Sequence, residues 1–375
     1  MIDKLIVEAP LNPLSLGNVS FNIIYELYKK GIKVLYLPIG QPDIGNYKTN
    51  EDFRNWLQDA NNRFFSEFKR DIPTLKIWHI NGSWQFPSDK KFLATFHECD
   101  TATSEELNIV KNTNKTFFCG SYSSNIFNDL GAKTYNYNLG FDTTSFSKVE
   151  KKKFDDKRIQ WFLGGKFEAR KNTAQILNLW AKKYGKKMGE SYKLGEQIHV
   201  LNVCVFNPFI GGNQDEVRIN NERLLAQSLE GQRYCNIQFF PFLDRDTFNQ
   251  LLNDSDIDLT GLSSAESWNL PAFNMTCLGK WSIVLNATGH KAWATDENSI
   301  LVQPNGKRSC VDGMFFQPNS PFNRGQFYTF DNEEVLKAME IAVTKVGTPN
   351  INGEKLVNQF TYQKTVEYLI EKISE

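Results

Sequence analysis

Short apolar runs alternate with helix-period segments along the first 150 residues. The apolar runs predict strands at residues 4–8, 33–37, 75–80, 91–96, 117–119 and 133–138. A cap at Asn18 or Ser20 begins the first predicted helix, which ends at Gly31. Further helices are predicted at residues 51–69, 101–110 and 123–130. Strands that alternate with helices at this spacing indicate a parallel, doubly wound α/β sheet.

The same alternation starts again after a dense charge run at residues 147–158 (SKVEKKKFDDKR), which has no apolar period. Strands are predicted at residues 159–163, 198–206, 236–240 and 281–285, with a short one at the start of 258–302. Helices are predicted at 173–183, 221–230, 247–252, 271–278 and 333–346, and one or two amphipathic helices at 354–373. The Gly/Pro/Asn-rich stretch 308–324 is expected to be an exposed loop. The charge run thus separates two α/β domains, residues 1–150 and 151–355, followed by a terminal helix at 356–375.

Composition narrows the class of protein. A chain of 375 residues exceeds the usual size of one hydrophobic core, which agrees with two domains. The 43 basic and 43 acidic residues cancel, so the net charge gives no sign of nucleic-acid binding or of an anionic membrane surface. The sequence has neither a signal-peptide pattern nor a run of 18 apolar residues. Six cysteines without a CxxC pair are typical of reduced, mostly buried thiols, so we expect a cytoplasmic protein without a metal site at its cysteines.

A basic glycine turn opens the second domain. Gly164 and Gly165 follow a strand, and Lys166, Arg170 and Lys171 precede a helix. The unpaired N–H groups at a helix start favour a phosphate, and the cations add full charges. The other interpretation is a plain surface cluster of Lys and Arg, but the glycine pair and the following helix favour an anion site.

A second polar turn lies in the stretch 258–302. A short strand leads to a Ser-rich turn with Glu266, and then to Leu270 and Pro271 at the start of a helix. Ligands of an open α/β sheet bind beyond the carboxyl ends of its strands, where Glu266 is expected to lie.

These two turns resemble the nucleotide-sugar signature of GT-B glycosyltransferases of the large family 4 type. Glu266 matches the family's first Glu, and Leu270 and Pro271 match its Gly-Phe-Gly-Leu-Pro-like turn. Asn274 stands where the family has a second Glu, and Asn269 replaces one of its small glycines. The spacing from Gly165-Lys166 to Lys171 resembles the Gly-Arg and Lys pair that holds the donor diphosphate.

The first domain carries weaker matches in the family's order. Gly17 resembles the glycine of the first loop, which lies near the donor and acceptor, although it could equally be a plain turn glycine. Thr95-Phe96-His97 resembles the Thr-x-His strand end whose His reaches the donor sugar, and the alternative is a His that hydrogen-bonds locally. Residues 140–146 resemble the sequence motif that closes the family's first domain.

The resemblance implies two Rossmann-like doubly wound domains facing across a cleft, with the last helix crossing back to the first domain. It implies a retaining transferase in which Lys166, Arg170 and Lys171 bind the diphosphate with Gly17 and the 269–271 turn. Glu266, His97 and Lys171 are the implied catalytic residues, and Asn274 would face the ribose. Phe242 and Leu243 would line the base pocket. The implied donor is a UDP- or GDP-sugar, the acceptor a glycan, lipid or small molecule, and neither a metal nor a further cofactor is implied.

Other classes fit less well. A dehydrogenase would need a GxGxxG fingerprint, and a glycosidase would need paired carboxylates. A non-catalytic glycan- or nucleotide-binding protein on the same fold stays open, because Asn274 replaces a carboxylate. A viral-type transferase acting on modified DNA also stays open, although the neutral charge disfavours it.

Overall fold

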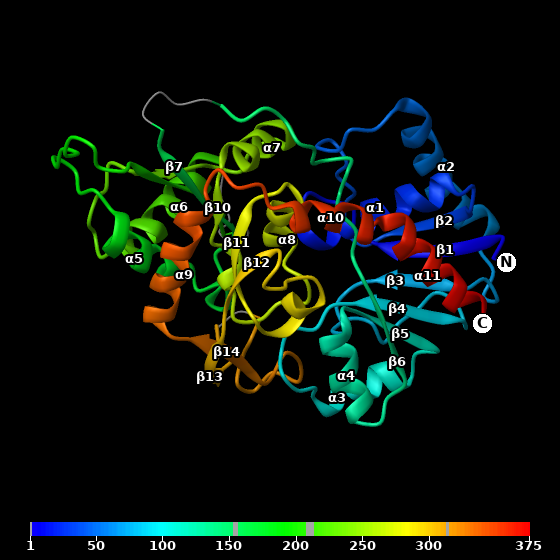
Figure 1. Ribbon diagram of the computed structural model, residues 1–375. Coiled ribbons are helices and arrows are strands. Elements are labelled where there is room, and N and C mark those ends of the chain that lie inside the picture. The colour runs from blue at the N-terminus through cyan, green and yellow to red at the C-terminus, as the bar shows by residue number, and fades with distance from the viewer. Residues whose placement is uncertain (1, 153–156, 208–213, 313–314) are drawn as a thin grey trace. The chain divides into compact units, whose positions relative to one another are not determined.

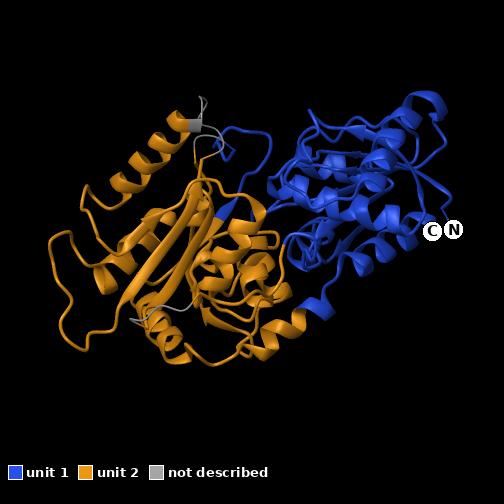
Figure 2. Cartoon of the chain, turned by 90° about the horizontal axis from the view of Figure 1, so that it is seen from above, with its two compact units in different colours: residues 1–145, 315–326, 357–375 blue, residues 146–314, 327–356 orange. Residues whose placement is uncertain are grey.

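The computed structural model (Figure 1) describes residues 2–152, 157–207, 214–312 and 315–375. Its chain forms two compact units, which Figure 2 colours separately. Unit 1 holds Met1–Ser145, Phe315–Gln326 and Val357–Glu375, and unit 2 holds Phe146–Met314 and Phe327–Leu356. The chain therefore passes between the units four times, whereas the sequence interpretation places only two passages, after residues 150 and 355.

Unit 1 is built on six parallel strands in the order β2-β1-β3-β4-β5-β6. They are β1 (Lys4–Ala9), β2 (Lys33–Pro38), β3 (Thr74–Ile77), β4 (Lys91–Thr95), β5 (Lys115–Cys119) and β6 (Thr134–Tyr137). Ile6 of β1 is in register with Leu35 of β2 and with Thr74 of β3. Leu5, Ile6 and Val7 are all buried. Because neighbouring side chains point to opposite faces of a strand, both faces of the sheet are covered at β1.

Five helices lie wholly within the described part of unit 1: α1 (Ser15–Lys29), α2 (Glu51–Glu67), α3 (Ser104–Lys111), α4 (Ser121–Asp129) and α11 (Tyr362–Ser374). A further helix, α10 (Ile351–Gln359), begins in unit 2 and ends in unit 1. A capping box starts α3, in which Thr103 accepts from the N–H of Glu106 and the Glu106 carboxylate accepts from the N–H of Thr103.

The C-terminal helix α11 packs on α1 and β6. Its start lies so close to Gly140 that a Cβ there would overlap the main chain of Thr361 and Tyr362. Thr365 donates to the carbonyl of Asn138 at 2.6 Å, and Lys30 of α1 pairs with Glu367 at 2.7 Å. The end of the chain is thus an integral part of unit 1.

Residues 315–326 pack on the connection between β4 and α3. The N–H of Gln326 donates to Asp100 at 2.7 Å, and the N–H of Asn323 donates to Glu106 at 2.8 Å. Thr103 donates to the carbonyl of Pro321 at 2.6 Å. This segment belongs to unit 1 through these contacts, although unit 2 precedes and follows it in sequence.

Unit 2 is built on a second sheet of six parallel strands, in the order β12-β11-β10-β7-β8-β9. They are β7 (Ile159–Lys166), β8 (His199–Phe206), β9 (Ile237–Phe239), β10 (Ile257–Asp258), β11 (Trp281–Leu285) and β12 (Ser299–Val302). The first strand of this unit, β7, lies between the second and the fourth, so the strand order reverses between β7 and β10. Such a reversal point is where open α/β sheets bind ligands.

The remaining elements of unit 2 cover this sheet or connect its strands. The helices are α5 (Thr173–Tyr184), α6 (Gln214–Ser228), α7 (Arg245–Asp254), α8 (Leu270–Cys277) and α9 (Asn332–Lys345). Three short 3-10 helices are η1 (Ala169–Lys171), η2 (Thr260–Leu262) and η3 (Thr288–Ala292), and a separate two-stranded sheet pairs β13 (Pro304–Ser309) with β14 (Gln326–Phe330). Trp161 of β7 and Trp180 of α5 are fully buried in the hydrophobic core.

The structure confirms the predicted fold class, with two parallel α/β sheets, and corrects several details. Helix α1 begins at Ser15 rather than after Asn18 or Ser20, because Asn12 accepts from the N–H of Leu14 and starts the turn earlier. The stretch 308–324 is not simply an exposed loop, since Cys310 and Phe316 are buried. The two-stranded sheet β13–β14 was not predicted, because β13 is mostly exposed and shows no apolar alternation.

Five of the six cysteines are buried and Cys235 is exposed. Among the helices described, none is long and apolar enough to cross a membrane.

Candidate functional site

Two loops of unit 2 meet at the point where the strand order reverses. One follows β7 and contains η1, and the other follows β10 and leads through η2 to residues 263–269. Strands β7 and β10 are neighbours, with Trp161 in register with Ile257. The N–H of Ser264 donates to the carbonyl of Arg170 at 2.7 Å, which joins the two loops directly.

The end of β7 and the loop after it contain two residues with positive φ. Gly165 has a φ of +112°, a conformation that residues with a Cβ rarely adopt. Asn172 has a φ of +54° and precedes α5. Its side chain donates to the carbonyl of Leu262 at 2.9 Å and to Ser264 at 2.8 Å, so it ties the start of α5 to the neighbouring loop.

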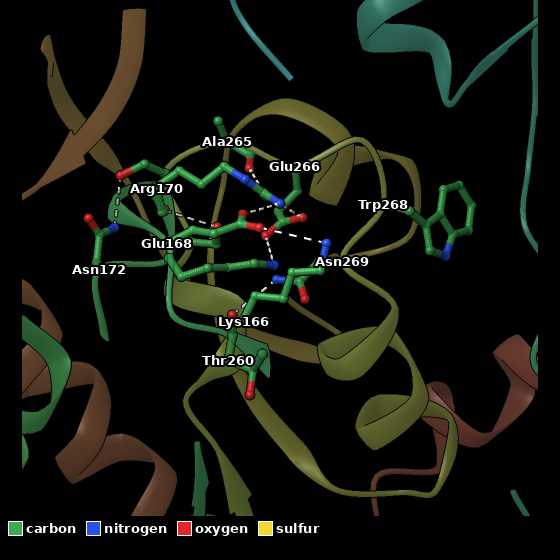
Figure 3. A network of polar contacts seen from close by, with 12 residues as sticks. Lys166, Glu168, Arg170, Asn172, Thr260, Ala265, Glu266, Trp268 and Asn269 are labelled. Atoms are coloured by element: carbon green, nitrogen blue, oxygen red, sulfur yellow. Dashed lines mark hydrogen bonds and ion pairs between the residues drawn. The ribbon is translucent and has the colours of Figure 1, made fainter. Parts of the chain in front are cut away.

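Charged side chains from both loops converge in one network, shown in Figure 3. Arg170 pairs with Glu168 at 2.8 Å and with Glu266 at 3.0 Å. Lys171 pairs with the other carboxylate oxygen of Glu266. Lys166 lies farther out, 3.7 Å from Glu168, with its side chain 24% exposed. The structure thus brings together four residues singled out from sequence and adds Glu168.

Glu266 is a buried carboxylate held in its ionised form. Burial by itself would raise the pKa of Glu266, but the charges of Arg170 and Lys171 outweigh that effect and hold the pKa well below its ordinary value. Burial likewise acts to raise the pKa of Glu168, but the charges of Arg170, Lys171 and Lys166 outweigh it and lower that pKa. Both carboxylates are therefore anionic at neutral pH.

A neutral histidine lies behind the Glu266 turn. His290 is fully buried, and burial lowers its pKa to about 4. Its Nδ1 lies 2.9 Å from the carbonyl of Leu285 and therefore carries the proton. Its Nε2 then accepts from the side chain of Asn269 at 2.9 Å. Asn269 has a φ of +66° and also donates to the carbonyl of Thr260 at 3.0 Å, so the turn before α8 is fixed from two sides.

Helix α8 starts directly after this turn. Leu270 and Pro271 occupy its first positions, where Pro lacks only an N–H that would have no partner within the helix. Asn274 lies one turn further on and is buried, and its Oδ1 has no hydrogen-bond partner in the part of the chain that the structure describes. Trp268 packs edge-on against Phe273.

The expected base pocket lies after β9. Phe242 is 52% exposed and packs edge-on against Phe206 of β8. Leu243 is half-buried, and the carbonyl of Pro241 faces the thiol of Cys204 at 3.6 Å. Phe239 is exposed, so its side chain is not part of the core.

The two candidates from the first domain lie in unit 1. Gly17 is in the first turn of α1, where a Cβ would overlap the main chain of Asn12, so close packing requires glycine there. His97 follows β4 and is only 2% exposed. Its Nε2 lies 2.9 Å from the carbonyl of Thr101, and its Nδ1 lies 4.0 Å from the carboxylate of Glu106. These are the local contacts that the alternative interpretation of His97 expected.

Sequence reasoning missed Glu168 and His290. Glu168 lies inside the basic turn, where three nearby cations could have indicated a partner carboxylate. His290 follows the glycine turn after β11, a position that offered no pattern of its own. Within the described ranges, no group of three or more His, Cys, Asp or Glu side chains could hold a metal ion.

Comparison with known proteins defines the class of fold. The sequence matches no protein-family model and no curated protein. Solved structures do match over the whole chain. Sucrose-phosphate synthase from Thermosynechococcus elongatus is 12% identical, with a TM-score of 0.65 over 99% of this chain and 98% of that one. Trehalose-6-phosphate synthase OtsA is 11% identical, with a TM-score of 0.64 over 99% of both chains. HepE from Anabaena, solved with UDP-glucose, is 13% identical, with a TM-score of 0.58 over 99% of both chains.

These structural neighbours are GT-B glycosyltransferases. The chain therefore has a GT-B-like fold built from two six-stranded parallel α/β sheets.

Proposed function

We propose that this protein is a metal-independent, retaining glycosyltransferase that uses a nucleotide-diphosphate sugar. The observation that carries the proposal is Glu266, a buried carboxylate held by Arg170 and Lys171 at the reversal point of the unit 2 sheet. A GT-B-like fold with such a constellation supports sugar transfer better than a binding role, since burying the four charged side chains of Glu168, Arg170, Lys171 and Glu266 without a use is costly.

The reaction breaks the bond between the anomeric carbon and the diphosphate oxygen of the donor. A bond to the acceptor oxygen forms, and the acceptor proton leaves with the diphosphate. Lys166, Lys171 and the N-terminus of α8 stabilise the charge that develops on the diphosphate, an electrostatic effect of roughly several kcal/mol. Glu266 accepts hydrogen bonds from hydroxyls of the donor sugar and orients it.

The remaining site residues stay predictions within this proposal. Phe242 and Leu243 would contact the base, and Asn274 would donate to or accept from the ribose hydroxyls. Gly17, at the start of α1, would lie near the donor diphosphate. A contact between His97 and the sugar would require exchange of one of its present contacts, to Thr101 or Glu106.

The donor is proposed to be a UDP-sugar before a GDP-sugar, because HepE was solved with UDP-glucose and an E. coli trehalose-6-phosphate protein with UDP-2-fluoro glucose. The acceptor is proposed to be the hydroxyl of a glycan, lipid or small molecule. The buried cysteines support the expectation of a reducing, cytoplasmic setting.

A thermal-shift screen against UDP, GDP, ADP and their sugars tests the proposal. A ligand at a hundredfold excess over its Kd stabilises the folded state by about 2.7 kcal/mol, a clear shift in such a screen. Release of free nucleotide from the stabilising donor is then followed by NMR. Binding without any turnover would favour the non-catalytic alternative, and the absence of both would overturn the enzyme proposal.

A further inference from the structure

We infer that Arg170 is a positioning residue for Glu266 rather than a ligand of the donor diphosphate. Glu168 keeps the Arg170 side chain in place by pairing with its guanidinium. The inference rests on the proposed function and separates the role of Arg170 from that of Lys166.

The guanidinium of Arg170 contacts two adjacent residues of the Glu266 turn. Its Nη1 donates to the carbonyl of Ala265 at 2.8 Å and lies 3.0 Å from a carboxylate oxygen of Glu266. The two hydrogens of Nη1 match these two acceptors. Arg170 therefore fixes both the main chain before Glu266 and the direction of its carboxylate.

The rest of Arg170 is also engaged with protein groups. Its Nη2 lies 2.8 Å from Glu168, whose side chain is 6% exposed. Its carbonyl accepts from the N–H of Ser264 at 2.7 Å and from the hydroxyl of Ser263 at 3.1 Å. The side chain of Arg170 is 9% exposed. A group so enclosed could reach a phosphate only by giving up one of two buried carboxylates, which would leave that carboxylate unpaired at a large cost.

Lys166 has the opposite character. Its side chain is the most exposed of the three cations, and its pairing with Glu168 at 3.7 Å is loose. Three cations face two carboxylates in this network, so one positive charge is left over. Lys166 can give that charge to a phosphate without breaking a tight buried pair, whereas Arg170 cannot.

The planar guanidinium of arginine suits simultaneous contacts to Glu168 and to the Glu266 turn. Two carboxylates and a carbonyl surround the guanidinium, and its fixed N–H directions serve them together. A lysine at this position could keep the charge but not the geometry. Arg170→Lys is therefore expected to retain the fold and to lose much of the orientation of Glu266.

The test compares Arg170→Gln and Arg170→Lys with Lys166→Ala. For the Arg170 variants, the Kd for UDP is expected to stay within about threefold of the wild type, while kcat with the donor that the thermal-shift screen selects falls about 100-fold, as for a misplaced catalytic group. For Lys166→Ala, the Kd for UDP is expected to rise about 10- to 100-fold through loss of a charge-assisted phosphate contact. Loss of UDP binding in the Arg170 variants, parallel to Lys166→Ala, would overturn the inference, as would an unchanged kcat.

A second readout needs no donor. The carboxyl ¹³C resonance of Glu266, assigned by its absence in Glu266→Gln, reports the pH at which this carboxylate takes up a proton. In Arg170→Gln its midpoint is expected to move toward the ordinary value of about 4.3. An unchanged midpoint would overturn the Arg170–Glu266 relationship, whatever the function. If the wild type binds no nucleotide but the Glu266 midpoint moves in Arg170→Gln, the proposed function alone would be overturned.

Discussion

The N–H of Gly289 donates to the carbonyl of Glu266 at 2.8 Å, and this contact locks the candidate catalytic turn against the loop after β11. The approach is so close that a Cβ on Gly289 would overlap the carbonyls of Glu266 and Ser267. Thr288 supports the same turn by accepting from the N–H of Glu266 at 3.1 Å. The position of Glu266 thus depends on a residue 23 places further along the chain.

Gly289→Ala is expected to destabilise the protein by about 2–4 kcal/mol, because main-chain atoms must move to admit the methyl group. Equilibrium urea unfolding measures the change. Gly45→Ala is the matched control, since Gly45 is exposed and its Cβ would meet only the Asp43 side chain, at 3.4 Å. Equal stability of the two variants would contradict the packing argument.

Glu266→Ala is expected to reduce donor turnover at least about 100-fold, because the sugar loses its orienting carboxylate. Turnover is measured as release of nucleotide from the donor. Glu340→Ala removes an exposed carboxylate that pairs with Lys183 and should leave turnover unchanged. Near-normal turnover in Glu266→Ala would refute its assignment.

Asp258→Asn is expected to stabilise the protein at pH 7.5 and not at pH 4. Asp258 is fully buried on β10, and burial raises its pKa to about 6 from an ordinary value of 3.8. A raised acid pKa favours folding while the carboxyl is protonated, and this contribution is lost as the pH rises through 6. The neutral amide avoids that loss and keeps an oxygen for the N–H of Thr260.

The gain for Asp258→Asn is expected to be roughly 1–3 kcal/mol at pH 7.5. Thermal unfolding at both pH values measures it, with the exposed Asp129→Asn as the control. A gain of the same size at both pH values would show that ionisation of Asp258 is not its cause.

His290 is expected to make the protein less stable in acid. Its pKa is lowered by burial to about 4 from 6.5, so between these pH values the unfolded chain is protonated at His290 while the folded chain is not. Its stabilising contribution is present above pH 6.5 and is lost as the pH falls toward 4. His290→Gln should therefore show a shallower fall in stability between pH 6.5 and 4, as followed by urea unfolding. An unchanged slope in His290→Gln would be inconsistent with this explanation.

The sequence was informative where local pattern and tertiary structure agree. The strand 281–285 was predicted with its observed bounds, Trp281–Leu285, because a buried parallel strand is a continuous apolar run. Gly165 and Lys166 end β7, Glu266 lies in the loop after β10, and all three could be recognised by residue type and position. Helix ends were less certain, since α6 begins seven residues before its predicted start at 221.

Other features depend on contacts that no local pattern records. Arg170 and Glu266 are 96 residues apart, and nothing in the sequence near either residue indicates that they form an ion pair. The same is true of His290 and Asn269, whose hydrogen bond fixes the turn before α8. The contacts that position the site residues could be learned only from the structure, whereas the types of charged residue at the site could be predicted from the sequence.

The segment 315–326 has a practical consequence for dissecting the protein. A fragment of residues 146–356 would carry this segment away from Asp100, Thr103 and Glu106, its partners in unit 1. A fragment made only of the remaining pieces of unit 1 would in turn lack a part of its own packing. Cutting the chain after residues 145 and 356 therefore yields neither unit as an intact folding unit.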